Sequence, residues 1–85
     1  MIMISDNALL DNLDRIRTTV LGIKRIKQNL DLKSDDAVIW CRQRIMQADS
    51  IIKKGKNWYV YSDDFIITVN AYSYTIITAH KRNKP

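Results

Sequence analysis

The spacing of apolar residues changes from a helical period to a strand period after Asp49, and this change constrains the fold more than any other feature. Before it, Leu9, Leu13 and Ile16 recur at intervals of four and three residues, which is the spacing of one face of a helix. After it, aromatic and β-branched residues alternate with polar ones in short segments, which indicates strands. The chain therefore predicts an α+β fold with a helical part at about residues 5–47 and a sheet part at about residues 50–82.

Two helices are expected in the first thirty residues. Ser5 is placed to cap the first, whose apolar face would continue to Val20. Thr18 and Thr19 should interrupt this pattern, because β-branched hydroxyl residues compete for backbone hydrogen bonds inside helices. Gly22 weakens the next turn, so the break between the two helices could move by a turn. The second helix would then run from about Val20 to Asn29. Its apolar face would be formed by Ile23, Ile26 and Leu30.

A third helix is expected from Ser34 to about Gln47. The Ser34 hydroxyl can cap the first turn, and the carboxylates of Asp35 and Asp36 oppose the positive end of the helix dipole. Its buried stripe would include Val38, Cys41 and Ile45.

Four strands with short connections are expected in the second half. They are Ser50–Lys54, Trp58–Ser62, Phe65–Asn70 and Tyr74–Lys81. Short connections join antiparallel neighbours, so the strands form a meander. The predicted architecture is a single domain over residues 1–85, with three N-terminal helices packed on one face of a four-stranded antiparallel β-meander.

Strand alternation assigns the side chains of this sheet to two faces. The core face would carry Trp58, Val60, Phe65, Ile67, Val69, Ile77 and Ala79. The other, open face would carry Tyr59, Tyr61, Ile66, Thr68, Asn70, Tyr74, Ile76, Thr78 and His80. A shift of one residue in any strand would exchange its two sets.

The charge is concentrated in the sheet part. The net charge of the 85 residues is +5, and residues 50–85 hold six of the fourteen basic side chains but only two of the nine acidic ones. No apolar run approaches the roughly 18 residues of a membrane span, and the apolar start of the chain is too short for a secretory signal. The lone Cys41 has no partner for an intramolecular disulfide. We therefore expect a cytoplasmic protein with no membrane association.

An open face of this composition predicts RNA binding. Lysine and arginine neutralise phosphate, tyrosine rings stack on unpaired bases, and hydroxyls and amides bond base edges. The candidate RNA-binding residues are Lys53, Lys54, Lys56, Tyr59, Tyr61, Asn70, Thr78 and Arg82. The competing interpretation is that tyrosine and threonine are good strand formers and that the lysines protect sheet edges.

His80 is the only side chain suited to acid–base chemistry near neutral pH. Together with Tyr74 and Lys81, it would permit metal-independent cleavage of RNA through the 2′-hydroxyl, as in an endoribonuclease of toxin type. A partly exposed histidine with no catalytic role is the alternative. One histidine and one distant cysteine do not form a zinc site, so we expect no metal and no cofactor.

Two other functional classes remain open from the residues alone. The open face is also suited to a non-catalytic contact with a protein partner or with a second copy of the chain, because Ile66 and Ile76 would lie on it. The protein would alternatively be a regulator that binds nucleic acid without cutting it.

Three segments resemble an uncharacterised family of small bacterial proteins known only as a domain of unknown function. They read GKNWYV at residues 55–60, ITVNA at 67–71 and SYTIITAHK at 73–81. The stretches 19–32 and 34–46 resemble it too, so the likeness covers most of the chain after Arg17. The family implies no activity. The architecture more distantly resembles the barnase, RelE and colicin-type ribonucleases. The chain lacks the glutamate that would serve as the general base in barnase, so the RelE toxins are the closer analogy.

Overall fold

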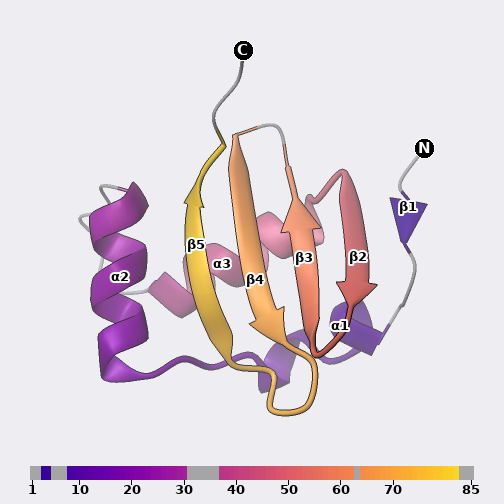
Figure 1. Ribbon diagram of the computed structural model, residues 1–85, viewed down its shortest axis with the longest axis horizontal. Helices are drawn as coiled ribbons and strands as arrows, with labels where there is room; N and C mark the ends of the chain where they lie inside the picture. The colour runs from indigo at the N-terminus through magenta and orange to yellow at the C-terminus, as the bar shows by residue number, and fades with distance from the viewer. Residues whose placement is uncertain (1–2, 5–7, 31–36, 63, 83–85) are drawn as a thin grey trace.

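The chain folds into helices and a sheet that share one hydrophobic core (Figure 1). A computed structural model describes residues 3–4, 8–30, 37–62 and 64–82. In chain order the elements are β1 Met3–Ile4, α1 Ala8–Asp11, the 3-10 turn η1 Leu13–Arg15, α2 Val20–Leu30, α3 Ala37–Met46, β2 Ser50–Lys54, β3 Asn57–Tyr61, β4 Phe65–Asn70 and β5 Ile76–Lys81. The predicted α+β class and the antiparallel meander of β2 to β5 are confirmed.

The sheet contains one strand more than the sequence predicts. Its order is β1-β2-β3-β4-β5, and β1 pairs in parallel with β2, with Met3 opposite Ser50 and Ile4 opposite Ile51. A strand of two residues is too short to show an alternating pattern, which is why the sequence does not reveal β1.

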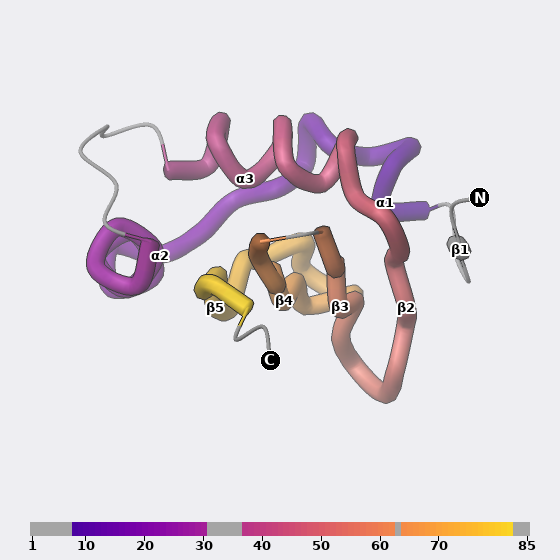
Figure 2. Tube along the Cα trace, turned by 90° about the horizontal axis from the view of Figure 1, so that it is seen from above, coloured from indigo at the N-terminus to yellow at the C-terminus, as the bar shows by residue number. Residues whose placement is uncertain are grey.

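Helices cover one face of the meander, which we call the covered face. α1 and α3 lie over it (Figure 2). Facing them is a row of paired residues, one from each strand of the meander: Ile51, Val60, Ile67 and Ala79. Each is at most 2% exposed, and Cys41 of α3 is fully buried with them. Burying these apolar side chains supplies the main stabilisation of the fold.

α2 lies beside β5, at the edge of the sheet (Figure 1). Packing of three helices on one face is therefore not confirmed. The Thr18 hydroxyl donates a hydrogen bond to the carbonyl oxygen of Ile76 at 3.0 Å, and the Asn29 amide donates to that of Ala79 at 3.4 Å. Arg17 forms a parallel bridge with Thr75. Residues 17–30 thereby cover the outer edge of β5, whose backbone groups would otherwise be open to pairing with another chain.

The prediction of the first helix is wrong beyond its first turn. α1 stops at Asp11 and η1 at Arg15, and the Arg17 backbone then pairs with β5 instead of continuing a helix. Leu9 and Ile16 are buried as predicted, but Val20 is exposed. The predicted cap Ser5 lies outside the described residues, as does Ser34, the predicted cap of the third helix.

α2 begins where the threonines predicted a break. The Thr19 hydroxyl accepts a hydrogen bond from the backbone amide of Gly22 at 2.9 Å, which is the capping contact expected three residues into a helix. Ile26 and Leu30 are buried, as their helical spacing predicts.

A β-bulge changes the predicted faces of β5. Thr68 pairs with Thr78, whereas the next residue, Val69, pairs with Ile76, so Ile77 is the extra residue. The predicted assignment of Ile77 to the core and of Ile76 to the open face is therefore wrong. Ile76 is 1% exposed and Ile77 is 40% exposed.

The segment before β5 also differs from the prediction, because Tyr74 is not part of the strand. Its φ of 58° places it in the left-handed region, which extended strands do not use. The Asn70 side-chain oxygen accepts hydrogen bonds from the backbone amides of Tyr72 and Ser73, both at 3.0 Å. This asparagine turn therefore delays the start of β5 to Ile76.

Candidate nucleic-acid interface

The second face of the meander, the open face, has no described helix over it (Figure 2). The strand register arranges its side chains in three rows. They are Ser50, Tyr61, Ile66 and His80; Ile52, Tyr59, Thr68 and Thr78; and Lys54, Asn57 and Asn70. Residues that pair across neighbouring strands point to the same face, so these rows form one continuous surface.

Two half-buried tyrosines of β3 occupy the middle of the open face. Tyr59 lies between Ile52 and Thr68, and Tyr61 lies between Ser50 and Ile66. Residues two apart in a strand are separated by about 7 Å. Two aromatic rings at this spacing can each stack on one base of an extended single strand.

Basic side chains stand at both ends of β3. Lys54 and Lys56 are exposed at the β2–β3 turn, next to Asn57. At the other end, the guanidinium of Arg82 lies 5.6 Å from the ring centroid of Tyr61 and donates a hydrogen bond to the carbonyl oxygen of Ser62 at 2.8 Å. A phosphate chain that follows β3 would meet positive charge at each end.

Two of the predicted basic residues point away from the open face. Lys53 pairs with Trp58, and Lys81 pairs with Phe65. Trp58 and Phe65 pack with the core on the covered side. Both lysines are exposed at strand ends, so they are accessible but belong to the covered side.

The two polar residues predicted to contact RNA, Thr78 and Asn70, differ in whether their side chains are available to a ligand. Thr78 is half-buried in the middle row opposite Thr68. The Asn70 side-chain oxygen accepts three hydrogen bonds, two from backbone amides and one from the Ser73 hydroxyl at 3.1 Å. That oxygen holds the turn together and is therefore not available to a ligand.

The three residues predicted as catalytic do not converge. His80 is exposed on the open face near the end of β5, whereas Lys81 alternates to the covered side. Tyr74 precedes the start of β5, six residues from His80, which corresponds to about 20 Å along a strand. Its ring centroid lies 5.2 Å from that of the buried Trp58. The positive φ of Tyr74 turns its ring to the covered side, contrary to its predicted place on the open face.

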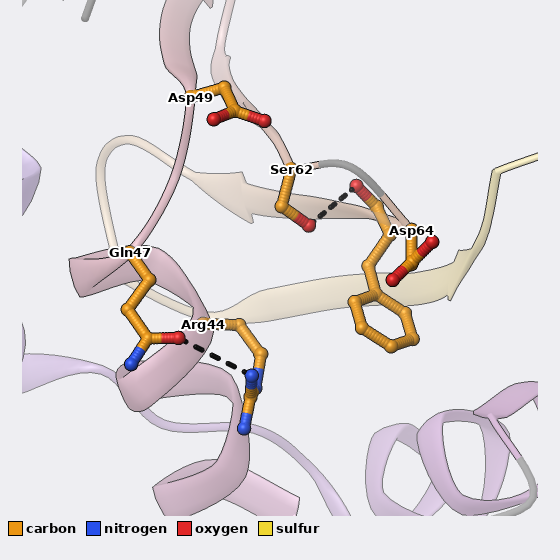
Figure 3. A pocket seen from close by; sticks show the side chains of 6 residues that line it. Arg44, Gln47, Asp49, Ser62 and Asp64 are labelled. Atoms are coloured by element: carbon orange, nitrogen blue, oxygen red, sulfur yellow. Dashed lines mark hydrogen bonds between the residues drawn. The ribbon is translucent and has the colours of Figure 1, made fainter.

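A cavity of about 190 Å³ lies where α3 meets the β3–β4 connection (Figure 3). The Ser62 hydroxyl donates to the carbonyl oxygen of Phe65 at 3.3 Å, and Arg44 donates to the Gln47 side chain at 3.3 Å. Asp49 and Asp64 complete the lining. Within the described ranges, no three His, Cys, Asp or Glu residues are close enough together to hold a metal ion.

A second cavity, of about 320 Å³, was not predicted from the sequence. It is lined by Arg15, Arg17, Tyr72, Ser73 and Tyr74. Both arginines fall within the segment predicted to form the first helix, and neither was predicted as a site residue. The sequence contains one indication of this cavity, because Asn70 and Ser73 are typical of an asparagine turn. Such a turn indicates that the connection between β4 and β5 extends past Ser73.

Cys41 is free and fully buried. Burial raises the pKa of its thiol from 9.0 to about 12, because the thiolate would lose its hydration. A thiol held protonated at neutral pH is a poor nucleophile.

The fold and the open face define a small α+β protein with an aromatic sheet surface that no described helix covers and with basic residues at the ends of that surface. The chain belongs to the family described as Protein of unknown function (DUF3781), whose model matches residues 10–80. That match confirms the resemblance to an uncharacterised family.

No curated protein and no solved structure matches the chain. The resemblance to the barnase and RelE ribonucleases has no support from these comparisons. In the part of the chain that the structure describes, no helix is long and apolar enough to cross a membrane.

Proposed function

We propose that this protein binds single-stranded RNA through the open face, with Tyr59 and Tyr61 stacking on consecutive bases. The observation that carries the proposal is the position of these two tyrosines, side by side on β3 in the middle of a face that no described helix covers. Base–aromatic stacking contributes about 1–3 kcal/mol per base and tolerates any sequence.

The basic residues around the tyrosines support an RNA path along β3. Lys54 and Lys56 lie at one end and Arg82 at the other. The four-residue rise from Asn57 to Tyr61 is about 13 Å, so a strand of a few nucleotides would span both ends. The hydroxyl of Thr78 and the ring of His80 border this path and supply hydrogen-bonding groups to base edges.

The proposal is binding without cleavage, because His80, Tyr74 and Lys81 point to different sides of the sheet. The earlier expectation of a metal-independent endoribonuclease remains open to a direct assay. In that assay the protein is incubated with total RNA in EDTA. Cleavage by the wild type that is lost in His80→Ala would support the endoribonuclease. A cytoplasmic location is part of this proposal, since RNA is available there.

A second candidate function is self-association or binding of a protein partner through the same face. It is favoured by two exposed apolar side chains: Ile52, which is 39% exposed in the middle row of that face, and Ile77, the bulge residue next to Thr78, which is 40% exposed. Size-exclusion chromatography would test the homodimer. A dimer whose formation is abolished by Ile52→Lys would favour this function over RNA binding.

The main test is fluorescence anisotropy with a labelled RNA of about ten nucleotides, a length within the usual site size of single-strand binders. Tyr59→Ala and Tyr61→Ala should each weaken binding by about 1–3 kcal/mol, whereas Tyr59→Phe, which retains the ring, should bind nearly as well as the wild type. Equal affinity of the wild type and both alanine variants would contradict the proposal.

Salt dependence separates the phosphate contacts from the stacking contacts. Lys54→Gln should reduce the slope of log affinity against log salt by about one. Lys24→Gln, on the exposed side of α2, makes the same charge change far from the open face and is the matched control. Identical slopes for the two variants would exclude Lys54 from the interface.

A further inference from the structure

The unpredicted cavity at the β4–β5 turn combines the chemistry needed to hold a phosphate group. Its volume is about 320 Å³, and its lining contains two arginines, two tyrosines and one serine but no acidic residue. Ligand pockets in proteins begin at about 300 Å³. The cavity is therefore large enough for a small ligand, and its charge favours an anion.

The first arginine, Arg17, is held in place by hydrogen bonds that involve only one of its guanidinium nitrogens. The Nε atom of Arg17 donates a hydrogen bond to the carbonyl oxygen of Ser73 at 3.2 Å. Its backbone amide donates to the carbonyl oxygen of Tyr74 at 3.0 Å, and its carbonyl oxygen accepts from the amide of Ile76 at 2.7 Å. The position of Arg17 is thus fixed by three bonds, none of which uses the two terminal nitrogens of its guanidinium.

The second arginine is oriented by an aromatic ring. The guanidinium of Arg15 lies 5.8 Å from the ring centroid of Tyr74. This cation–π contact directs the guanidinium without using its N–H donors. Arg15 and Arg17 both line the cavity, and two guanidinium groups are well suited to a phosphate because each can bind it through parallel bonds.

The turn that carries the tyrosines is held by side-chain hydrogen bonds and contains one strained residue. Tyr74 holds a left-handed φ of 58°, a conformation that costs about 1–3 kcal/mol for a residue other than glycine. The turn is fixed by Asn70 and by a hydrogen bond of 2.8 Å between the hydroxyls of Ser73 and Thr75, in which Thr75 donates because the Ser73 proton is directed to Asn70. Strained residues of this kind cluster at binding sites. Beside it, Tyr72 is 77% exposed, so its ring is available for stacking.

We infer that this cavity binds the phosphate group of a nucleotide, with Arg15 and Arg17 holding the phosphate and Tyr72 stacking on the base. The nucleotide is either free or the phosphorylated end of an RNA strand, since both present the same chemistry. The inference does not depend on the open face, because none of the residues that line the cavity belongs to the three rows of that face.

Isothermal titration calorimetry with adenosine 5′-monophosphate, inorganic phosphate and adenosine tests this site. The nucleotide should bind more tightly than either of its parts. Arg15→Gln should weaken it at least about tenfold, the usual effect of losing a charged hydrogen bond, while Arg25→Gln on the exposed side of α2 should leave it unchanged. Tyr72→Ala should reduce the affinity for the nucleotide to that for inorganic phosphate.

Two results would overturn the inference. One is no heat of binding for the nucleotide at millimolar concentration with the wild-type protein. The other is equal weakening by Arg15→Gln and Arg25→Gln, which would indicate attraction by net charge alone. Circular dichroism of each variant would verify that the fold is retained, and Arg15→Lys provides a second variant that keeps the charge but removes the paired donors.

A comparison of two oligonucleotides identifies the source of the phosphate. If RNA with a 5′-phosphate binds more tightly than the same RNA with a 5′-hydroxyl, and Arg15→Gln removes the difference, the ligand is an RNA end. If the mononucleotide binds and the two RNAs do not differ, the ligand is a free nucleotide. Loss of RNA binding in Tyr59→Ala with unchanged mononucleotide binding would separate this cavity from the open face.

Discussion

The two faces of the meander are built from the same strands but differ in composition and in exposure. On the covered face, the row Ile51, Val60, Ile67 and Ala79 is apolar and at most 2% exposed. On the open face, the neighbouring row is Ile52, Tyr59, Thr68 and Thr78, which mixes aromatic, hydroxyl and aliphatic groups. Alternation along each strand thus separates the apolar core residues from a mixed set of side chains, in which Ile52 is 39% exposed while Thr68 is only 8% exposed.

The largest test of this difference compares Trp58 with its neighbour Tyr59. Trp58 is 2% exposed and is the largest of the fully buried side chains, so Trp58→Ala should lower the free energy of unfolding by about 3–5 kcal/mol. Tyr59→Ala should cost about 1 kcal/mol or less, as substitutions at partly exposed positions do. Urea denaturation followed by circular dichroism measures both. Similar losses would show that the open face is covered in solution.

The bulge in β5 provides the next comparison, between two consecutive isoleucines. Ile76→Ala should cost about 2–5 kcal/mol because it leaves a cavity in the core. Ile77→Ala should cost less than about 1 kcal/mol, because Ile77 is the extra residue of the bulge and is 40% exposed. The same denaturation experiment applies. A larger loss for Ile77 than for Ile76 would support a regular strand without a bulge.

Gly22 extends the comparison to the edge of the sheet. Alanine is the better helix former by about 1 kcal/mol, but a Cβ atom on Gly22 would overlap the Thr18 hydroxyl, which donates to the carbonyl oxygen of Ile76. Gly22→Ala should therefore destabilise the protein by about 1–3 kcal/mol. In a Thr18→Ala background the same substitution should be neutral or stabilising. An equal loss in both backgrounds would show that the two residues are not coupled.

The buried thiol of Cys41 gives the smallest effect. Its pKa is about 12 in the folded protein, above the ordinary value of 9.0. Between these values the unfolded chain has lost the proton that the folded protein keeps. The contribution of the protonated thiol to the free energy of unfolding is complete below pH 9. It falls as the pH rises toward 12, by at most about 1.4 kcal/mol per pH unit. Urea denaturation at pH 9 and pH 10 should show a steeper loss for the wild type than for Cys41→Ala, and parallel losses would refute burial of the thiol.

The sequence predicts most of the regular elements because their signals are local. The strands β2 and β4 have the predicted bounds, and α2 begins at Val20, directly after the two threonines, as predicted. The first helix is wrong because pairing of Arg17 with Thr75, a contact distant in sequence, overrides a helical pattern that fits Leu9 and Ile16. Tertiary contacts of this kind leave no local mark.

The candidate site is only partly predictable, for reasons that differ by residue. Tyr59, Tyr61, Thr78 and His80 lie on the open face as predicted, because regular alternation holds in β3 and in the end of β5. The bulge is invisible in the sequence, since Ile76 and Ile77 are equally apolar. Tyr74 is misplaced because its left-handed φ depends on the turn that Asn70 organises.

The way in which residues 17–30 cover the β5 edge has a consequence for the order of folding. The meander joins strands that are neighbours in the chain, whereas the bond from Thr18 to Ile76 closes a separation of 58 residues. Contacts between distant residues form slowly because a long loop must close first. We therefore expect the hairpins to form first and the N-terminal segment to dock last. During that interval the outer edge of β5 is unprotected, and rapid refolding at high protein concentration should favour aggregation through it.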